Sequence, residues 1–241
     1  MAYPRSPAAI ARIGRDEFLS ERWDYDPGQH VTILGPTGCG KTILAQQLLV
    51  RSATPQLPGI MLVMKPRDKE VTRFLRENRW KRHVSWPPPR VPFMRPPAGH
   101  CVWPRATFDF DADDENMART FGNVLRHSYK VGDRIIMADE VVGLAQELKL
   151  GRGLNAIWTR GRSLGTGLWA MTQRPAYVPL NAYSQAEHLL IAYEPDADTR
   201  KRYGEIGGVD PKLVSAAVES LPEYHFLYLR RTGRHICIIG P

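Results

Sequence analysis

The feature that most constrains this chain is a glycine-rich loop set between an apolar run and a helix-forming run. His30–Leu34 predicts a buried strand, and Thr42–Arg51 predicts a helix. The loop between them is Gly35-Pro36-Thr37-Gly38-Cys39-Gly40-Lys41-Thr42, which fits the pattern G-x-x-x-x-G-K-S/T. In that context the backbone N–H groups of the loop face a phosphate chain, and a Gly-rich turn without a ligand is disfavoured. We therefore expect residues 35–42 to bind the phosphates of ATP.

The last two residues of this loop have separate expected roles. Lys41 is expected to reach the β- and γ-phosphates, and the Thr42 hydroxyl is expected to ligate Mg²⁺. The glycines at 35, 38 and 40 let the backbone curl around the phosphates.

Two acidic residues follow a second apolar run. Arg134–Ala138 predicts a buried strand, and Asp139 and Glu140 come at its carboxyl end, the edge at which α/β sheets bind ligands. We expect Asp139 to hold the Mg²⁺ shell and Glu140 to orient and deprotonate the attacking water. A helix N-cap is the structural alternative for Asp139.

Gln173 ends a further predicted strand, which begins at Gly167 and is expected beside the strand that carries Asp139. Its amide can contact the γ-phosphate or the attacking water, or else cap the turn before Pro175. Arg160 and Arg162 end the helix predicted before that strand, and Arg174 is a third arginine nearby. Any of the three is a candidate for an arginine finger that completes a neighbouring subunit's site, and a solvated helix end is the alternative.

Other segments are predicted as follows. Residues 1–29 form a lead-in with a helix over Ile10–Leu19, and residues 30–241 form one ATPase domain with a Pro-rich insertion at about 84–105. Strands alternating with helices predict a mainly parallel α/β sheet sandwiched by helices. The remaining expected elements are strands at Ile60–Met64, His100–Trp103 and His188–Tyr193, helices at Lys69–Trp80 and Asn116–Tyr129, and a C-terminal antiparallel hairpin of Tyr224–Arg230 and His235–Ile239.

The charge balance indicates a polyanionic partner. The net charge is +8, and basic residues crowd the segment from Lys65 to His83. Such a run suits sequence-independent phosphate contacts with nucleic acid, although a membrane surface or a solvated helix face are alternatives. No apolar stretch approaches the roughly 18 residues of a membrane span, and neither a secretory signal nor a disulfide framework is recognisable. We therefore expect a cytoplasmic protein.

In this order, the motifs resemble those of the FtsK–HerA superfamily of DNA-pumping ATPases. The resemblance rests on His30–Thr42, Arg134–Glu140, Arg160–Ser163 leading into Thr172–Pro175, Ser184–Gly208 and Leu221–Phe226. It implies a P-loop NTPase fold of the RecA-like (ASCE) type, a hexameric ring, an arginine finger acting in trans, and double-stranded DNA in a central pore. Small packaging ATPases of tailless, membrane-containing viruses have a similar format, as do the cytoplasmic halves of filamentous-phage assembly proteins of the zonula-occludens-toxin type.

The leading hypothesis is therefore an ATP-hydrolysing, Mg²⁺-dependent DNA translocase that packages a viral genome, with a capsid or portal protein as partner. An ATPase that powers DNA transfer or filamentous-phage assembly at a membrane protein is the alternative within the same chemistry. A P-loop kinase with a lid from residues 66–105 is a third hypothesis, against which Glu140 and Gln173 argue. A non-catalytic nucleotide-dependent scaffold is a fourth.

Overall fold

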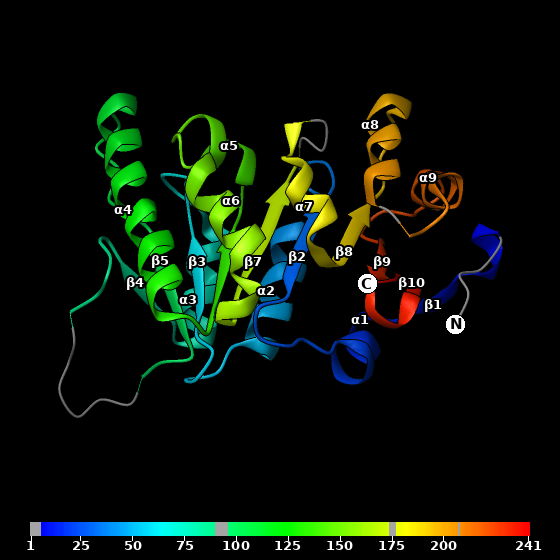
Figure 1. The fold of residues 1–241 in the computed structure, drawn as a ribbon, viewed down its shortest axis with the longest axis horizontal. Helices are drawn as coiled ribbons and strands as arrows, with labels where there is room; N and C mark the ends of the chain where they lie inside the picture. The colour runs from blue at the N-terminus through cyan, green and yellow to red at the C-terminus, as the bar shows by residue number, and fades with distance from the viewer. Residues whose placement is uncertain (1–5, 90–95, 174–176, 207) are drawn as a thin grey trace.

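The computed structural model describes residues 6–89, 96–173, 177–206 and 208–241. These residues form a ten-stranded sheet in the order β1-β10-β9-β8-β2-β7-β6-β3-β5-β4, with helices on both faces (Figure 1). Its neighbouring strands run parallel except at β8–β9 and β9–β10. The strands are β1 (Ala11–Ile13), β2 (His30–Leu34), β3 (Gly59–Leu62), β4 (Lys81–His83), β5 (Gly99–Val102), β6 (Arg134–Ala138), β7 (Thr166–Thr172), β8 (Ala186–Ala192), β9 (Phe226–Arg230) and β10 (His235–Ile239).

The central strands are buried on both faces because apolar side chains alternate between two helical layers. In β6, Ile135 and Met137 pack toward one layer while Ile136 and Ala138 pack toward the other. The layer behind the sheet in Figure 1 contains α2 (Lys41–Ser52) and α3 (Lys69–Asn78). The opposite layer contains α4 (Phe110–Val131), α5 (Val141–Gln146), α6 (Gly151–Arg160), α7 (Leu180–Ser184) and α9 (Pro211–Glu219), and α8 (Ala197–Lys201) lies near α9.

Aspartates start several of these helices. The carboxylate of Asp68 accepts from the Val71 N–H at α3, that of Asp109 from the Ala112 N–H at α4, and that of Asp210 from the Lys212 N–H at α9. Each carboxylate satisfies an N–H that has no partner within the helix, which fixes where the helix begins. The expected helix Lys69–Trp80 is confirmed as α3, and the helix expected from Asn116 begins six residues earlier, at Phe110.

The N-terminal segment differs from the expectation. The predicted helix over Ile10–Leu19 is wrong in its first half, because residues 11–13 form β1, parallel to β10. Helical turns follow as α1 (Arg15–Glu17) and a π-helical segment (Phe18–Arg22). Phe18 is fully buried against Tyr228 of β9, so the lead-in shares the sheet and core of the rest of the chain.

The Pro-rich stretch includes the predicted strand at His100–Trp103. This strand is confirmed as β5, which begins and ends one residue earlier. Basic residues just before this stretch form β4, an edge strand that the sequence did not predict. Gly99 allows the Trp80 ring to pack closely, since a Cβ there would lie 2.0 Å from the ring. Within residues 84–89 and 96–98, no helix or strand occurs.

The C-terminal hairpin is confirmed as β9 and β10, joined by a turn at Thr232–Arg234. It does not form the edge of the sheet, because β1 covers β10. Among the described residues, none of the helices has the length and hydropathy needed to cross a bilayer.

Candidate active site

The loop of residues 35–42 joins the carboxyl end of β2 to the start of α2. Its glycines 35, 38 and 40 have φ values of 155°, 84° and 89°, which side chains disfavour. A Cβ on Gly35 would also lie 2.5 Å from the Cβ of Ala192 in β8. The loop thus curls over the end of the sheet in the manner expected of a phosphate cradle.

Lys41 lies inside this curl. Its ammonium group donates to the carbonyl oxygens of Gly35 at 2.6 Å and Pro36 at 2.7 Å. Burial lowers the pKa of Lys41, and the nearby Cys39, Asp139 and Glu140 act in the opposite direction. The ammonium group is therefore held at the loop by acceptors that a phosphate oxygen could replace.

Thr42 and Asp139 meet where a Mg²⁺ ion would need two oxygen ligands. The Thr42 hydroxyl donates to Asp139 Oδ1 at 3.1 Å. A hydroxyl and a carboxylate are hard oxygen donors of the kind that Mg²⁺ prefers, so the pair fits the ion. The other oxygen, Asp139 Oδ2, lies 3.6 Å from the ammonium group of Lys65.

Lys65 is a site residue that the sequence analysis did not single out as such. Burial lowers its pKa, but the charges of Asp139 and Asp68 outweigh burial and raise it. The position could have been noticed, because Lys65 directly follows a predicted strand and so reaches the same sheet edge as Asp139.

Glu140 is fixed by donors on two elements. Its Oε1 accepts from the Thr172 hydroxyl at 2.8 Å and from the Val142 N–H at 3.2 Å, which makes Glu140 the N-cap of α5. Its Oε2 lies 3.5 Å from the Gln173 N–H. The helix-cap alternative considered for Asp139 therefore applies to its neighbour, and the cap orients the carboxylate.

Gln173 directly follows β7, which pairs with β2 on one side and β6 on the other. The expected adjacency to the strand before Asp139 is confirmed. Its side-chain Oε1 accepts a hydrogen bond from the Thr37 hydroxyl of the loop. The Gln173 side chain thus contacts the loop, while the backbone N–H of the same residue faces Glu140.

Arg160 and Arg162 lie at the opposite edge of the sheet. Both precede β7, whose seven residues, at roughly 3.3 Å each, separate them from Gln173 by about 20 Å. Both side chains are exposed, and Arg160 lies over the Tyr129 ring, with 5.1 Å from Cζ to the ring centroid. Neither can reach the loop of its own chain. Arg174 lies outside the described residues.

Solved structures share this fold. The DNA-packaging ATPase B204 from Sulfolobus turreted icosahedral virus is 18% identical, with a TM-score of 0.63 over 90% of this chain and 99% of that one. The genome-packaging NTPase B204 of Sulfolobus turreted icosahedral virus 2, in complex with AMPPCP, is 19% identical, with a TM-score of 0.60 over 90% of this chain and 100% of that one. The chain therefore shares the fold of these packaging NTPases.

The pCW3 conjugation coupling protein TcpA has this P-loop ATPase fold too, at 16% identity and a TM-score of 0.52 over 98% of this chain and 69% of that one. No family model matches the sequence, and no curated protein has a significantly similar sequence.

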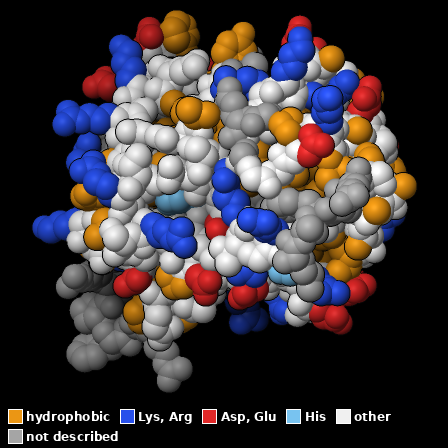
Figure 2. Space-filling view, turned by 45° about the vertical axis from the view of Figure 1, so that its right-hand side comes forward, with side chains coloured by type: hydrophobic (Ala, Val, Ile, Leu, Met, Phe, Trp, Pro, Cys, Tyr) orange, Lys and Arg blue, Asp and Glu red, His pale blue; other side chains and the backbone are white. Residues whose placement is uncertain are grey.

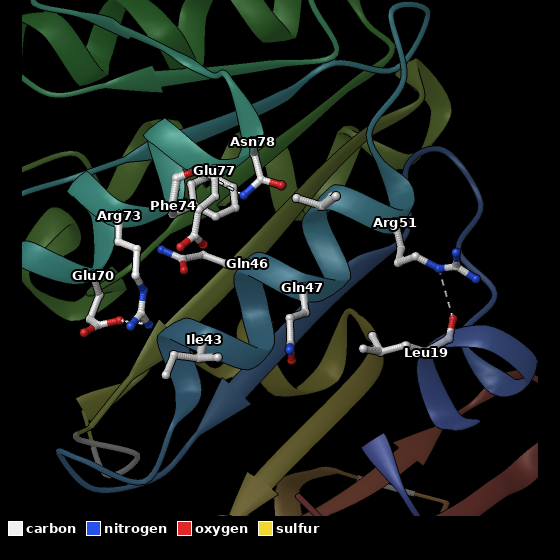
Figure 3. A pocket seen from close by; sticks show the side chains of 11 residues that line it. Leu19, Ile43, Gln46, Gln47, Arg51, Glu70, Arg73, Phe74, Glu77 and Asn78 are labelled. Atoms are coloured by element: carbon white, nitrogen blue, oxygen red, sulfur yellow. Dashed lines mark hydrogen bonds and ion pairs between the residues drawn. The ribbon is translucent and has the colours of Figure 1, made fainter. Parts of the chain in front are cut away.

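A hollow of about 460 Å³ lies between α2 and α3, on the flank of the sheet (Figure 3). Gln46 and Gln47 project into it from α2, and each has a buried polar atom without a protein partner. The α3 side carries Glu70 and Glu77 beside Arg73. Its described lining includes none of the residues from Gly35 to Thr42, so we assign it no part of the candidate nucleotide site.

Proposed function

We propose that this chain is an ATP-hydrolysing motor that moves DNA, and that its task is to package double-stranded DNA. The observation that supports hydrolysis is the meeting of three pairs at one sheet edge: Thr42 with Asp139, Thr172 with Glu140, and Thr37 with Gln173. Each pair joins segments that are distant in the sequence, and together they surround the position that a γ-phosphate would take beyond Lys41.

In this proposal each residue has one task. Lys41 exchanges its carbonyl acceptors for β- and γ-phosphate oxygens, and Thr42 and Asp139 hold Mg²⁺, which when bound neutralises charge on those oxygens. Glu140, oriented by Thr172 and the start of α5, accepts the proton of the attacking water. Gln173 contacts that water or the γ-phosphate, exchanging its bond to Thr37.

The arginines suggest that the site is completed between subunits. The length of β7 separates Arg160 and Arg162 from Gln173 of their own chain by about 20 Å, so an arginine finger at either position would act on a neighbour's nucleotide. We propose a homo-oligomeric ring, as the resemblance implies, in which one of them neutralises transition-state charge.

Basic residues on the exposed face of α3, which also carries Glu70 and Glu77, support DNA as the substrate. Lys69, Arg73 and Arg76 are exposed on this helix, while Val71 and Phe74 of its other face are buried. Arg73 has an ion pair with Glu70, which leaves Lys69 and Arg76 as the better candidates for phosphate contacts. On the face drawn in Figure 2, by contrast, basic side chains are dispersed among acidic and hydrophobic ones, so the charge on that face does not form one patch.

The similarity to two genome-packaging NTPases from viruses favours packaging. The similarity to a conjugation coupling protein supports a second candidate, DNA transfer at a membrane protein. Co-purification with a capsid or portal protein, or with a membrane protein, separates the two.

The test of the motor is phosphate release with and without duplex DNA over a salt series. We expect DNA to stimulate release, and the stimulation to fall as salt rises, because phosphate contacts release counterions. If the rate of phosphate release by a folded, ATP-binding protein did not change when DNA was added at low salt, the DNA assignment would be contradicted. Transfer of the phosphate to a small-molecule acceptor would instead identify a kinase.

A further inference from the structure

A second hollow, of about 540 Å³, adjoins the loop on the side away from Asp139 and Glu140. Residues 36–39 of the loop form one wall. The end of β8 forms another with Ala192 and Tyr193, and residues 221–225, just before β9, form the third. We call this the tyrosine pocket, after Tyr193 and Tyr224.

The order of the strands fixes which end of a nucleotide faces this pocket. The residues around the γ-phosphate position follow β6 and β7, which lie on one side of β2. Strand β8 pairs with β2 on the other side. A triphosphate in the loop with its γ end toward Gln173 therefore directs its nucleoside toward the end of β8, where the tyrosine pocket opens.

Tyr224 is held against the loop by its backbone. A Cβ on Gly40 would lie 3.5 Å from Tyr224 Cδ1, so the ring packs at the start of α2. Tyr224 has a φ of 60°, which is uncommon for a side-chain-bearing residue, and its carbonyl accepts from the Arg15 guanidinium at 3.0 Å. Tyr224 nevertheless remains 46% exposed, and Tyr193 remains 41% exposed.

An exposed aromatic ring beside a phosphate cradle has a suitable partner in a nucleobase. A flat ring can stack on a base of any type, and such stacking contributes substantially to binding. We propose that the tyrosine pocket binds the base and ribose of the nucleotide, with Tyr224 as the principal stacking residue and Tyr193 as a second contact. This inference rests on the proposed nucleotide-binding function and adds to it the residues that recognise the nucleoside.

The experiment compares ATP with inorganic tripolyphosphate, which has the phosphates but no nucleoside. Calorimetric titrations use the full chain and its Tyr224→Ala, Tyr224→Phe, Phe110→Ala and Lys41→Ala variants. Phe110 is the matched control, because it is an exposed aromatic residue at the start of α4 and does not line the pocket.

We expect Tyr224→Ala to raise the Kd for ATP about tenfold and to change the Kd for tripolyphosphate less than twofold. Tyr224→Phe and Phe110→Ala should both remain within about twofold of the parent for ATP. Lys41→Ala should weaken the binding of both ligands, because it removes a phosphate contact.

An equal loss of affinity for ATP and for tripolyphosphate in Tyr224→Ala, or no loss of affinity for either ligand, would overturn the inference while leaving the ATPase proposal intact. If the parent chain bound neither ligand, both proposals would fail. If Tyr224→Ala did not fold, Tyr193→Ala would serve in its place, with a smaller selective loss of ATP expected and the same two outcomes against the inference.

Discussion

The substitution Thr172→Val tests whether Glu140 works in the orientation that the structure shows. Thr172 is 1% exposed, and its hydroxyl donates to Glu140 Oε1 at 2.8 Å. Valine has a similar shape and lacks the donor. A hydrogen bond to a charged group contributes about 1.5–3 kcal/mol, and about 1.4 kcal/mol corresponds to tenfold in rate.

The expected fall in kcat is at the lower end of that range, about tenfold. The reason is that the Val142 and Gln173 N–H groups would still face the Glu140 carboxylate. The KM for ATP should change little, because the substitution keeps the backbone carbonyl of Thr172, which accepts from the Gly35 N–H of the loop at 3.3 Å. Steady-state phosphate release at saturating ATP measures the effect.

Thr166→Val is the matched control, since Thr166 is a fully buried threonine at the other end of the same strand, where its hydroxyl donates to Ser128 O at 3.4 Å. It should leave kcat near the parent value. In a Glu140→Gln background, adding Thr172→Val should lower the residual kcat little further, because the two side chains act as one unit. A full tenfold further loss in that background, or an equal loss in the Thr166→Val control, would refute the reasoning.

Three more predictions address the site and the fold. Lys41→Ala should abolish ATP binding or turnover, whereas Glu140→Gln should retain binding and lose hydrolysis; nucleotide-binding and phosphate-release assays separate the two, and equal turnover by Glu140→Gln and the parent would remove Glu140 as the base. Arg160→Ala or Arg162→Ala should bind ATP normally yet lose the assembly-dependent rate, and mixing either variant with Glu140→Gln subunits should restore some activity if the arginine acts in trans; no recovery at any mixing ratio counts against it. Burial, reinforced by Arg230, lowers the pKa of His188 from 6.5 to about 3. The unfolded chain therefore takes up the proton first as pH falls, and this group alone should reduce the free energy of unfolding by about 1 kcal/mol between pH 7 and 5.5. Urea unfolding at the two pH values measures it, His188→Gln should show a smaller decrease, and greater stability at pH 5.5 would contradict the sign.

The sequence predicted the parts of the site that sit directly after a strand. Asp139 and Gln173 each follow an apolar run, and strand ends in a parallel sheet meet at one edge, so local pattern and chain connectivity were sufficient. The glycine pattern located the loop in the same way, since it marks backbone conformations that other residues disfavour.

The sequence could not predict contacts that depend on distant pairing. Strand β1 exists because β10, near the other end of the chain, offers it a free edge. The short segment Ile10–Ile13, which includes Arg12, fits a helix equally well. Thr172 was missed as a partner of Glu140 because the contact crosses between neighbouring strands. Lys65 was missed as a partner of Asp139 because its side chain was counted with the basic run that follows it, although its place after a predicted strand brings it to the same sheet edge. The tyrosine pocket likewise combines three segments that only the tertiary fold brings together.

Strand β7 has a mechanical consequence. All seven of its residues are buried, and it is hydrogen-bonded to a parallel neighbour along both sides, so it can hardly bend independently of the sheet. At one end Gln173 contacts the phosphate loop, and at the other the chain arrives directly from Arg162. In a ring where Arg162 contacts a neighbour's nucleotide, β7 would link two successive nucleotides rigidly. Loss of a phosphate beside Gln173 would then shift Arg162 at the neighbouring nucleotide without any change in the shape of the domain.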